Sequence, residues 1–69
     1  MKLLLIMQVC SALHMSCMNE MVVNEYPTHY DCATAGYLNA IGLTQKLGQE
    51  EVDRSRITVK FECRPVDLI

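Results

Sequence analysis

The residues of this chain best suited to chemistry are thiols and imidazoles. They are Cys10, Cys17, Cys32 and Cys63, with His14 and His29. An even number of cysteines in a chain of 69 residues is typical of a disulfide framework, a metal site or a redox pair. The choice among the three depends on which elements of the fold carry the cysteines and where those elements lie.

A zinc site is the first alternative to disulfides. Thiolate and imidazole are the ligands that Zn²⁺ prefers in tetrahedral sites. One candidate set is Cys10, His14, Cys17 and Cys32, with Cys63 or His29 as other candidates for the fourth ligand. The spacing matches no common zinc finger or ribbon, and the chain has no C-x-x-C pair. We therefore favour disulfides without a metal, and both histidines at the surface.

Cys32 is also the strongest candidate for catalysis. A helix N-terminus activates a thiolate, but the redox partner of such a cysteine usually lies close in the sequence, and Cys32 has no close partner. Hydrolysis by Cys32 with His29 and Asp31 would need an oxyanion hole and a cleft, for which so short a chain has little volume. We therefore predict no catalytic residues and no cofactor. The alternative function is a small zinc-binding or thiol-redox protein.

The composition is that of one small globular domain covering residues 1–69. Hydrophobic residues make up 51% and charged residues 20%, and the net charge of −2 argues against nucleic-acid binding. A chain this short usually needs disulfides, a metal or self-association for stability. Because there is no Trp and only one Phe, at least half of four methionines are expected to fill the core. These are Met7, Met15, Met18 and Met21.

The apolar segment at the N-terminus has two interpretations. In MKLLLIMQVCSA, the apolar run 3–9 and the small residues Cys10 and Ala12 have the outline of a signal peptide and its cleavage site. The run is too short to span a bilayer. A continuous apolar stretch of this length is also typical of a buried central strand. We interpret residues 2–10 as that strand.

Residues 28–48 carry the helix signals. Thr28 and Asp31 resemble a capping box, and Gly48 suits the left-handed residue that ends a helix. The face expected to pack on a sheet consists of Cys32, Ala33, Gly36, Tyr37, Ala40, Leu43 and Leu47. The mixed-charge run 48–56 that follows is predicted to be a solvated turn.

Two further segments complete the predicted fold. Residues 56–64 alternate between polar and apolar side chains, which predicts a half-buried strand that Pro65 ends. Residues 21–23 suit a short strand, because long loops without secondary structure are uncommon. We therefore predict an α+β fold, a three-stranded antiparallel sheet with one helix packed on it, in the order β-β-α-β. Without the short strand the order would be β-α-β.

The order of the elements decides how the cysteines meet. In the β-β-α-β layout, Cys10 faces Cys17 across a hairpin, and Cys32 in the first helical turn lies near Cys63 at the end of the last strand. The β-α-β layout would gather all four at one end, which leaves the pairing open and permits a metal cluster. Four cysteines allow three pairings. We predict Cys10–Cys17 and Cys32–Cys63, which require an oxidising compartment.

Two motifs resemble small uncharacterised cysteine-containing α/β proteins encoded by bacteriophages. They are Tyr26, Tyr30, Cys32, Ala35 and Gly36 at the helix start, and Phe61 with Cys63 in the last strand. The resemblance spans residues 1–64 and implies no activity, so no catalytic role is carried over. It implies an accessory protein of a phage that acts on a host or virion protein, located in a virion or host cell.

The functional expectation is a non-enzymatic binding protein with a protein partner. Three observations support this expectation. The sequence shows no assembled catalytic set, its net charge is negative, and disulfides are expected to make the small scaffold rigid. A homodimer is a second candidate assembly, because an exposed Leu38 beside a free sheet edge would suit self-association.

Overall fold

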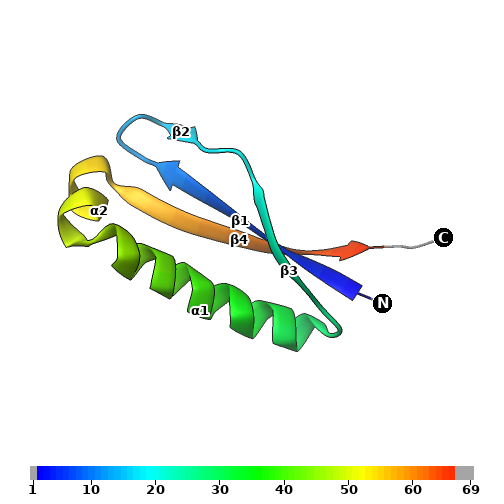
Figure 1. Cartoon of the computed structure of the whole chain (residues 1–69). Coiled ribbons are helices and arrows are strands. Elements are labelled where there is room, and N and C mark those ends of the chain that lie inside the picture. The colour runs from blue at the N-terminus through cyan, green and yellow to red at the C-terminus, as the bar shows by residue number, and fades with distance from the viewer. Residues whose placement is uncertain (1, 67–69) are drawn as a thin grey trace.

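The computed structural model describes residues 2–66. In chain order the elements are β1 (Lys2–Ser11), β2 (Ser16–Cys17), β3 (Met21–Tyr26), α1 (His29–Leu47), α2 (Gln49–Ser55) and β4 (Ile57–Val66). The molecule has two layers, an antiparallel sheet and the long helix α1, which lies along one face of the sheet (Figure 1). The predicted α+β class is confirmed.

The central strand of the sheet is β1. On one side it pairs with β4 along its whole length, from Lys2 opposite Val66 to Ser11 opposite Ile57. On its other side, β2 pairs with the end of β1 and β3 pairs with its beginning. Each of these pairings is antiparallel. The second strand of the predicted β-β-α-β order is therefore present but divided in two.

The core lies between β1 and α1. Alternate residues Leu3, Leu5 and Met7 of β1 are buried there with Cys32 of the helix. Six partly buried residues pack around them, namely Tyr26, Ala35, Ala40, Val59, Phe61 and Cys63. Ile6 on the opposite face of β1 is buried as well. A strand buried on both faces needs a nearly continuous apolar sequence, which explains the run that resembles a signal peptide.

Local capping sets the bounds of α1. The Thr28 hydroxyl accepts a hydrogen bond from the backbone N–H of Asp31 at 3.1 Å, as a helix N-cap does. At the other end, Gly48 has a φ of 89° and its N–H donates to the Thr44 carbonyl. A positive φ of this kind is easily adopted by glycine alone. The helix predicted over residues 28–48 is confirmed, with these two residues as its caps.

Gly36 allows α1 to approach β4 closely. A Cβ atom at this position would overlap the ring of Phe61. The same ring packs edge-to-face against Tyr37, with the ring centroids 4.8 Å apart. Phe61, the single phenylalanine of the chain, therefore packs directly against the backbone of α1 at Gly36.

The prediction of a solvated turn over the run 48–56 is wrong. Residues Gln49–Ser55 form the short helix α2. The carboxylate of Glu51 accepts hydrogen bonds from Arg54 and from the Ser55 hydroxyl, which link successive positions of one helical turn. Arg56 then ends α2 in a left-handed conformation with a φ of 51°. Local side-chain pairing thus gives the charged run a helical form.

The prediction that Pro65 ends the last strand is also wrong, because Pro65 pairs with Leu3 inside β4. The N–H of Ala12 donates to the carbonyl of Arg56, 2.9 Å away and directly opposite. Backbone groups of an antiparallel strand point to alternate sides. Even-numbered residues of β4 therefore point their backbone groups at β1, and odd-numbered residues point theirs away. A proline at an odd position removes no hydrogen bond from the sheet.

Several side chains lie further out than the sequence suggests. Of the four methionines, only Met7 is buried. The side chains of Met15, Met18 and Met21 are exposed, so core filling by at least half of them is wrong. Tyr37 and Leu47, expected on the packing face of the helix, are exposed too. Ala35 takes a place in the core that the helical projection does not assign to it.

Candidate interaction surface

All four cysteines form disulfides, in the two predicted pairs. Cys10 in β1 lies directly opposite Cys17 in β2, and their Cα atoms are 3.9 Å apart. The neighbouring backbone bond runs from the N–H of Met18 to the carbonyl of Val9. The cysteines therefore occupy a pair without mutual backbone bonds, in which side chains of an antiparallel ladder lie closest. This disulfide fixes the hairpin between β1 and β2.

The second disulfide joins the two layers of the fold. Cys32 lies in the first turn of α1 and is fully buried, and its Cα is 6.1 Å from that of Cys63 in β4. Alternation along β4 places Cys63 on the helix-facing side with Val59 and Phe61. The bond therefore fixes the start of the helix over the sheet.

The residues considered for chemistry are not assembled into a reactive site. Cys32 is bonded to Cys63, so it is not a free thiol beside His29 and Asp31, both of which are exposed. The alternative zinc set fails for the same reason, since its Cys32 is bonded outside the set and its Cys10 to Cys17. Within residues 2–66, no group of three or more His, Cys, Asp or Glu side chains could hold a metal ion.

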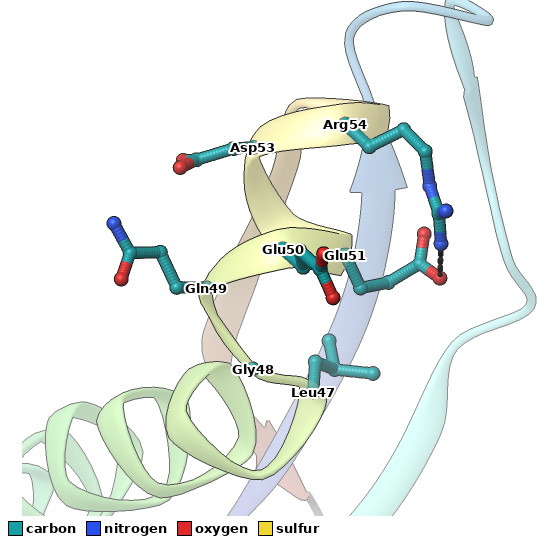
Figure 2. A pocket seen from close by; sticks show the side chains of 7 residues that line it. All are labelled: Leu47, Gly48, Gln49, Glu50, Glu51, Asp53 and Arg54. Atoms are coloured by element: carbon teal, nitrogen blue, oxygen red, sulfur yellow. Dashed lines mark hydrogen bonds and ion pairs between the residues drawn. The ribbon is translucent and has the colours of Figure 1, made fainter.

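One hollow, with a volume of about 770 Å³, lies at the corner between α1 and α2. It is lined by Leu47, Gly48, Gln49, Glu50, Glu51, Asp53 and Arg54 (Figure 2). Figure 2 shows Gln49 and Asp53 pointing away from Glu50 and Glu51, and Glu51 bonded to Arg54. Hydrogen bonds from Arg54 and Ser55 lower the pKa of the Glu51 carboxyl. The polar side chains that line the hollow either point away from one another or pair with each other. The hollow is therefore a bend in the surface and does not gather groups for a reaction.

Charged side chains cover the face of the sheet opposite α1. Arg64 bridges Glu62 at 2.9 Å and Glu20 at 3.5 Å, which places ion pairs across β1. The hydrogen bond from Arg64 lowers the pKa of the Glu62 carboxyl, and the same bond raises the pKa of Arg64. Beneath these long side chains Ile6 is shielded from water. The surface of this face is therefore mainly polar, although Val22, opposite Ile6, is exposed on it.

The outer face of α1 is the opposite in character. From Cys32 to Gln45 the helix has no charged residue. Four large apolar side chains are more than half exposed on it, namely Tyr30, Tyr37, Leu38 and Ile41. A surface helix of a monomeric protein normally turns charged and polar residues to solvent. α1 departs from this pattern between Cys32 and Gln45, which makes its outer face the candidate contact surface of the described residues.

Grooves run along both flanks of α1. One lies between the helix and β3, with a volume of about 420 Å³, and is lined by Met7, Met21, Val23, Leu38, Asn39, Gly42, Leu43 and Lys46. Gly42 has no neighbour within 4 Å of where a Cβ would be, so the groove is open at this point. Met21 and Val23 alternate onto one face of β3, and the β1–β3 register shift between Leu5 and Ile6 puts that face on the same side as Tyr26. The helix and β3 thus form an apolar trough with one cation at its rim.

The hairpin tip between β1 and β2 carries a smaller apolar surface. Leu13 and Met15 are exposed there, and Met15, the most exposed at 89%, has a positive φ of 52°. Met18 adds a third exposed apolar side chain beyond β2. Methionine is an adaptable contact residue, and these positions fit that use better than core filling.

No family model matches the chain, and neither the comparison with curated proteins nor that with solved structures found a match. Neither helix in the described part of the chain has the length and apolar character needed to cross a membrane. The fold and its surface thus define a class only: a small disulfide-bonded α+β protein with one charged face and one uncharged apolar helix face.

Proposed function

We propose that this protein is a non-enzymatic binding module whose ligand is another protein. The observation that carries the proposal is the uncharged outer face of α1, whose large apolar side chains are exposed on a scaffold fixed by two disulfides. A rigid scaffold loses little conformational entropy when it binds, which favours affinity from a small surface.

The partner is proposed to insert an apolar side chain or helix into the trough between α1 and β3. The lining is mainly apolar, and Leu38 stands at its edge with two thirds of its surface exposed. Helix-in-groove recognition uses apolar anchors of this kind. Lys46 at the rim favours a partner with a carboxylate beside its apolar anchor, since opposite charges at a rim steer association.

The biological setting proposed is that of a phage accessory protein acting on a host or virion protein. Its support is the sequence resemblance at Tyr26, Tyr30, Cys32 and Phe61, together with disulfides that suit an oxidising environment such as a virion. Binding experiments with host lysate and with purified virions distinguish the two partner sources.

The test is a pull-down with the immobilised, oxidised protein, comparing wild type with Leu38→Asp and Met15→Asp. Both substitutions place the same charge at a well-exposed apolar residue, so neither perturbs the core. One defined partner should bind wild type and Met15→Asp, and its affinity for Leu38→Asp should fall about tenfold or more. Loss of binding with Met15→Asp alone would show that the binding surface lies at the hairpin tip. Turnover of a substrate would overturn the proposal.

A further inference from the structure

The outer edge of β4 is long, regular and unpaired by any strand within residues 2–66. Its pairing with β1 continues without a register shift over all ten residues of the strand. The opposite edge of the sheet is interrupted, because β2 has two residues and β3 contains a register shift. Short strands and bulges protect a sheet edge from pairing with other chains. Only the β3 side has this protection.

The free backbone groups of β4 follow from its pairing with β1. Because the carbonyl of Arg56 accepts from Ala12, even-numbered residues of β4 bond to β1. The N–H groups of Ile57, Val59, Phe61 and Cys63 therefore point outward from the sheet. Pro65 also lies at an outward position and keeps a free carbonyl. The edge thus offers alternating donors and acceptors that match those of another extended strand.

We propose that a second copy of this chain pairs with this edge, β4 against β4, around a two-fold axis at Phe61. Antiparallel pairing of the edge with itself places the two-fold axis at one residue, which is either an outward-pointing residue or a residue bonded to β1. With the axis at Phe61, Val59 faces Cys63 of the second copy, and Ile57 faces its Pro65. Each outward N–H from Ile57 to Cys63 then has a carbonyl opposite it.

Charge and the position of Pro65 together favour the same register. On the open face of the sheet, the axis at Phe61 sets Lys60 opposite Glu62 of the second copy, and the symmetry repeats this pair. Opposite charges directly across a ladder are stabilising. An axis at Val59 would set Lys60 opposite Thr58 instead. An axis at Lys60 or at Glu62 would set that residue opposite its own symmetry copy, with like charges facing each other. An axis at Cys63 would pair Glu62 with Arg64, but it would place the missing N–H of Pro65 opposite the Phe61 carbonyl and would shorten the overlap.

The helices fit this arrangement. A two-fold axis perpendicular to a continuous sheet leaves both copies of α1 on one face, antiparallel to each other. The flank of α1 beside β4 contains Ala33 and Tyr37, and it borders a groove of about 590 Å³. A second helix could pack there, with Ala33 leaving room beside Tyr37, at the roughly 8–10 Å spacing of packed helices. The exposed Tyr37 and the Phe61 ring would then meet their symmetry copies at the centre.

The exposed surface of the single chain is larger than its mass requires. It measures 5183 Å² for a 7.8 kDa chain, whereas a compact folded monomer of that mass exposes about 4400 Å². The molecule is a thin plate, with extents of 43 × 20 × 12 Å. Pairing along β4 would bury part of this excess. The dimer would cover Tyr37 of the outer face of α1 but leave the trough with Leu38 open, because the trough lies on the other flank of the helix.

Sedimentation equilibrium and amide hydrogen exchange of the oxidised chain test the inference together. The protein should be a dimer, and raising its concentration should protect the amides of Val59, Phe61 and Cys63. The amides of Lys60 and Glu62, bonded to β1, should be protected at every concentration. A monomer at millimolar concentration would overturn the inference. So would a dimer in which the odd-numbered amides of β4 stay unprotected.

Charge reversal tests the register. Lys60→Glu alone sets a carboxylate opposite the Glu62 carboxylate in both halves, and the dimer dissociation constant should rise about tenfold. Glu62→Lys alone should act likewise by setting two ammonium groups opposite each other. An equimolar mixture of the two variants should form a heterodimer as tight as the wild-type dimer, whereas failure to recover would overturn the register. Lys2→Glu, the same change on the central strand, is the matched control and should dimerise like wild type.

Discussion

The two disulfides lie toward opposite ends of β1 and differ in what they hold. Cys10 and Cys17 are 7 residues apart and already face each other in the sheet. Cys32 and Cys63 are 31 residues apart and lie in different layers, with Cys32 fully buried. The first bond therefore supports local pairing, whereas the second holds the helix on the sheet. Stability should depend mainly on the second bond.

The largest effect is expected from the double variant Cys32→Ser/Cys63→Ser. In the chain-entropy model, opening a loop of 31 residues costs about 3–4 kcal/mol. That is a large share of the roughly 5–15 kcal/mol that holds a small domain. Urea denaturation monitored by circular dichroism measures the loss. A free energy of unfolding within about 1 kcal/mol of wild type would show that packing alone holds α1 in place.

The matching variant Cys10→Ser/Cys17→Ser should cost less, about 2 kcal/mol, because its loop is short. The remaining backbone bond from Met18 to Val9 should keep the end of the hairpin paired. Hydrogen exchange should therefore speed up in β2 and leave the amides of α1 unchanged. If this variant proved less stable than the variant without Cys32 and Cys63, the Cys10–Cys17 disulfide would contribute more to stability than the Cys32–Cys63 disulfide, contrary to the expectation.

Substitutions at two glycines of α1 test the close contact between the helix and β4 near Cys63, and their expected effects on stability are smaller. Gly36→Ala should destabilise by about 1–2 kcal/mol, since the new methyl overlaps Phe61 and the better helix propensity offsets only part of the cost. Gly42→Ala is the matched control, because nothing lies within 4 Å of its Cβ position. It should stabilise by about 0.5–1 kcal/mol. Equal effects of both variants in thermal denaturation would contradict the close approach of α1 to β4.

The smallest effect concerns Arg64, which follows Cys63 in β4. Its hydrogen bond lowers the pKa of Glu62, so the pair adds stability above the unfolded pKa of the carboxyl and loses it as the pH falls through the folded pKa. Arg64→Met should raise the pKa of Glu62 toward its ordinary value and leave the pKa of Glu51, paired with Arg54, where it is. NMR titration of both carboxyls measures this. An unchanged pKa of Glu62 in this variant would show that the Arg64–Glu62 pair does not persist in solution.

The sequence predicts the parts of this fold that rest on local signals. Alternation in 56–64, the cap at Thr28 and the glycine at 48 locate the last strand and the helix, and the element order then pairs the cysteines correctly. Some errors depend on neighbours across the sheet, whereas the missed helix α2 depends on local side-chain pairing. Pro65 fits inside β4 only because its side of the strand is free. The exposure of Met18 and Met21 follows from their place on an edge of the sheet.

The candidate surface is only partly predictable. Leu38 is exposed as expected, and the sheet has the free edge that the sequence suggests. The trough beside Leu38 is not predictable, because the face of β3 with Met21 and Val23 shares its side with Tyr26 only through the register shift between Leu5 and Ile6. A one-residue shift of this kind changes which side chains share a face, and alternation alone does not reveal it.

The pairing of β1 with β4 brings the two ends of the described chain together, and this has a consequence for synthesis on the ribosome. Of the strands described, the central strand emerges first and its longest neighbour emerges last. Cys10 and Cys17 emerge close together, but Cys32 leaves the ribosome 31 residues before Cys63. At about 5–20 residues per second, Cys32 waits about 2–6 s for its partner. During this interval a wrong bond to Cys10 or Cys17 competes with the hairpin, so early closure of Cys10–Cys17 leaves Cys32 with its correct partner.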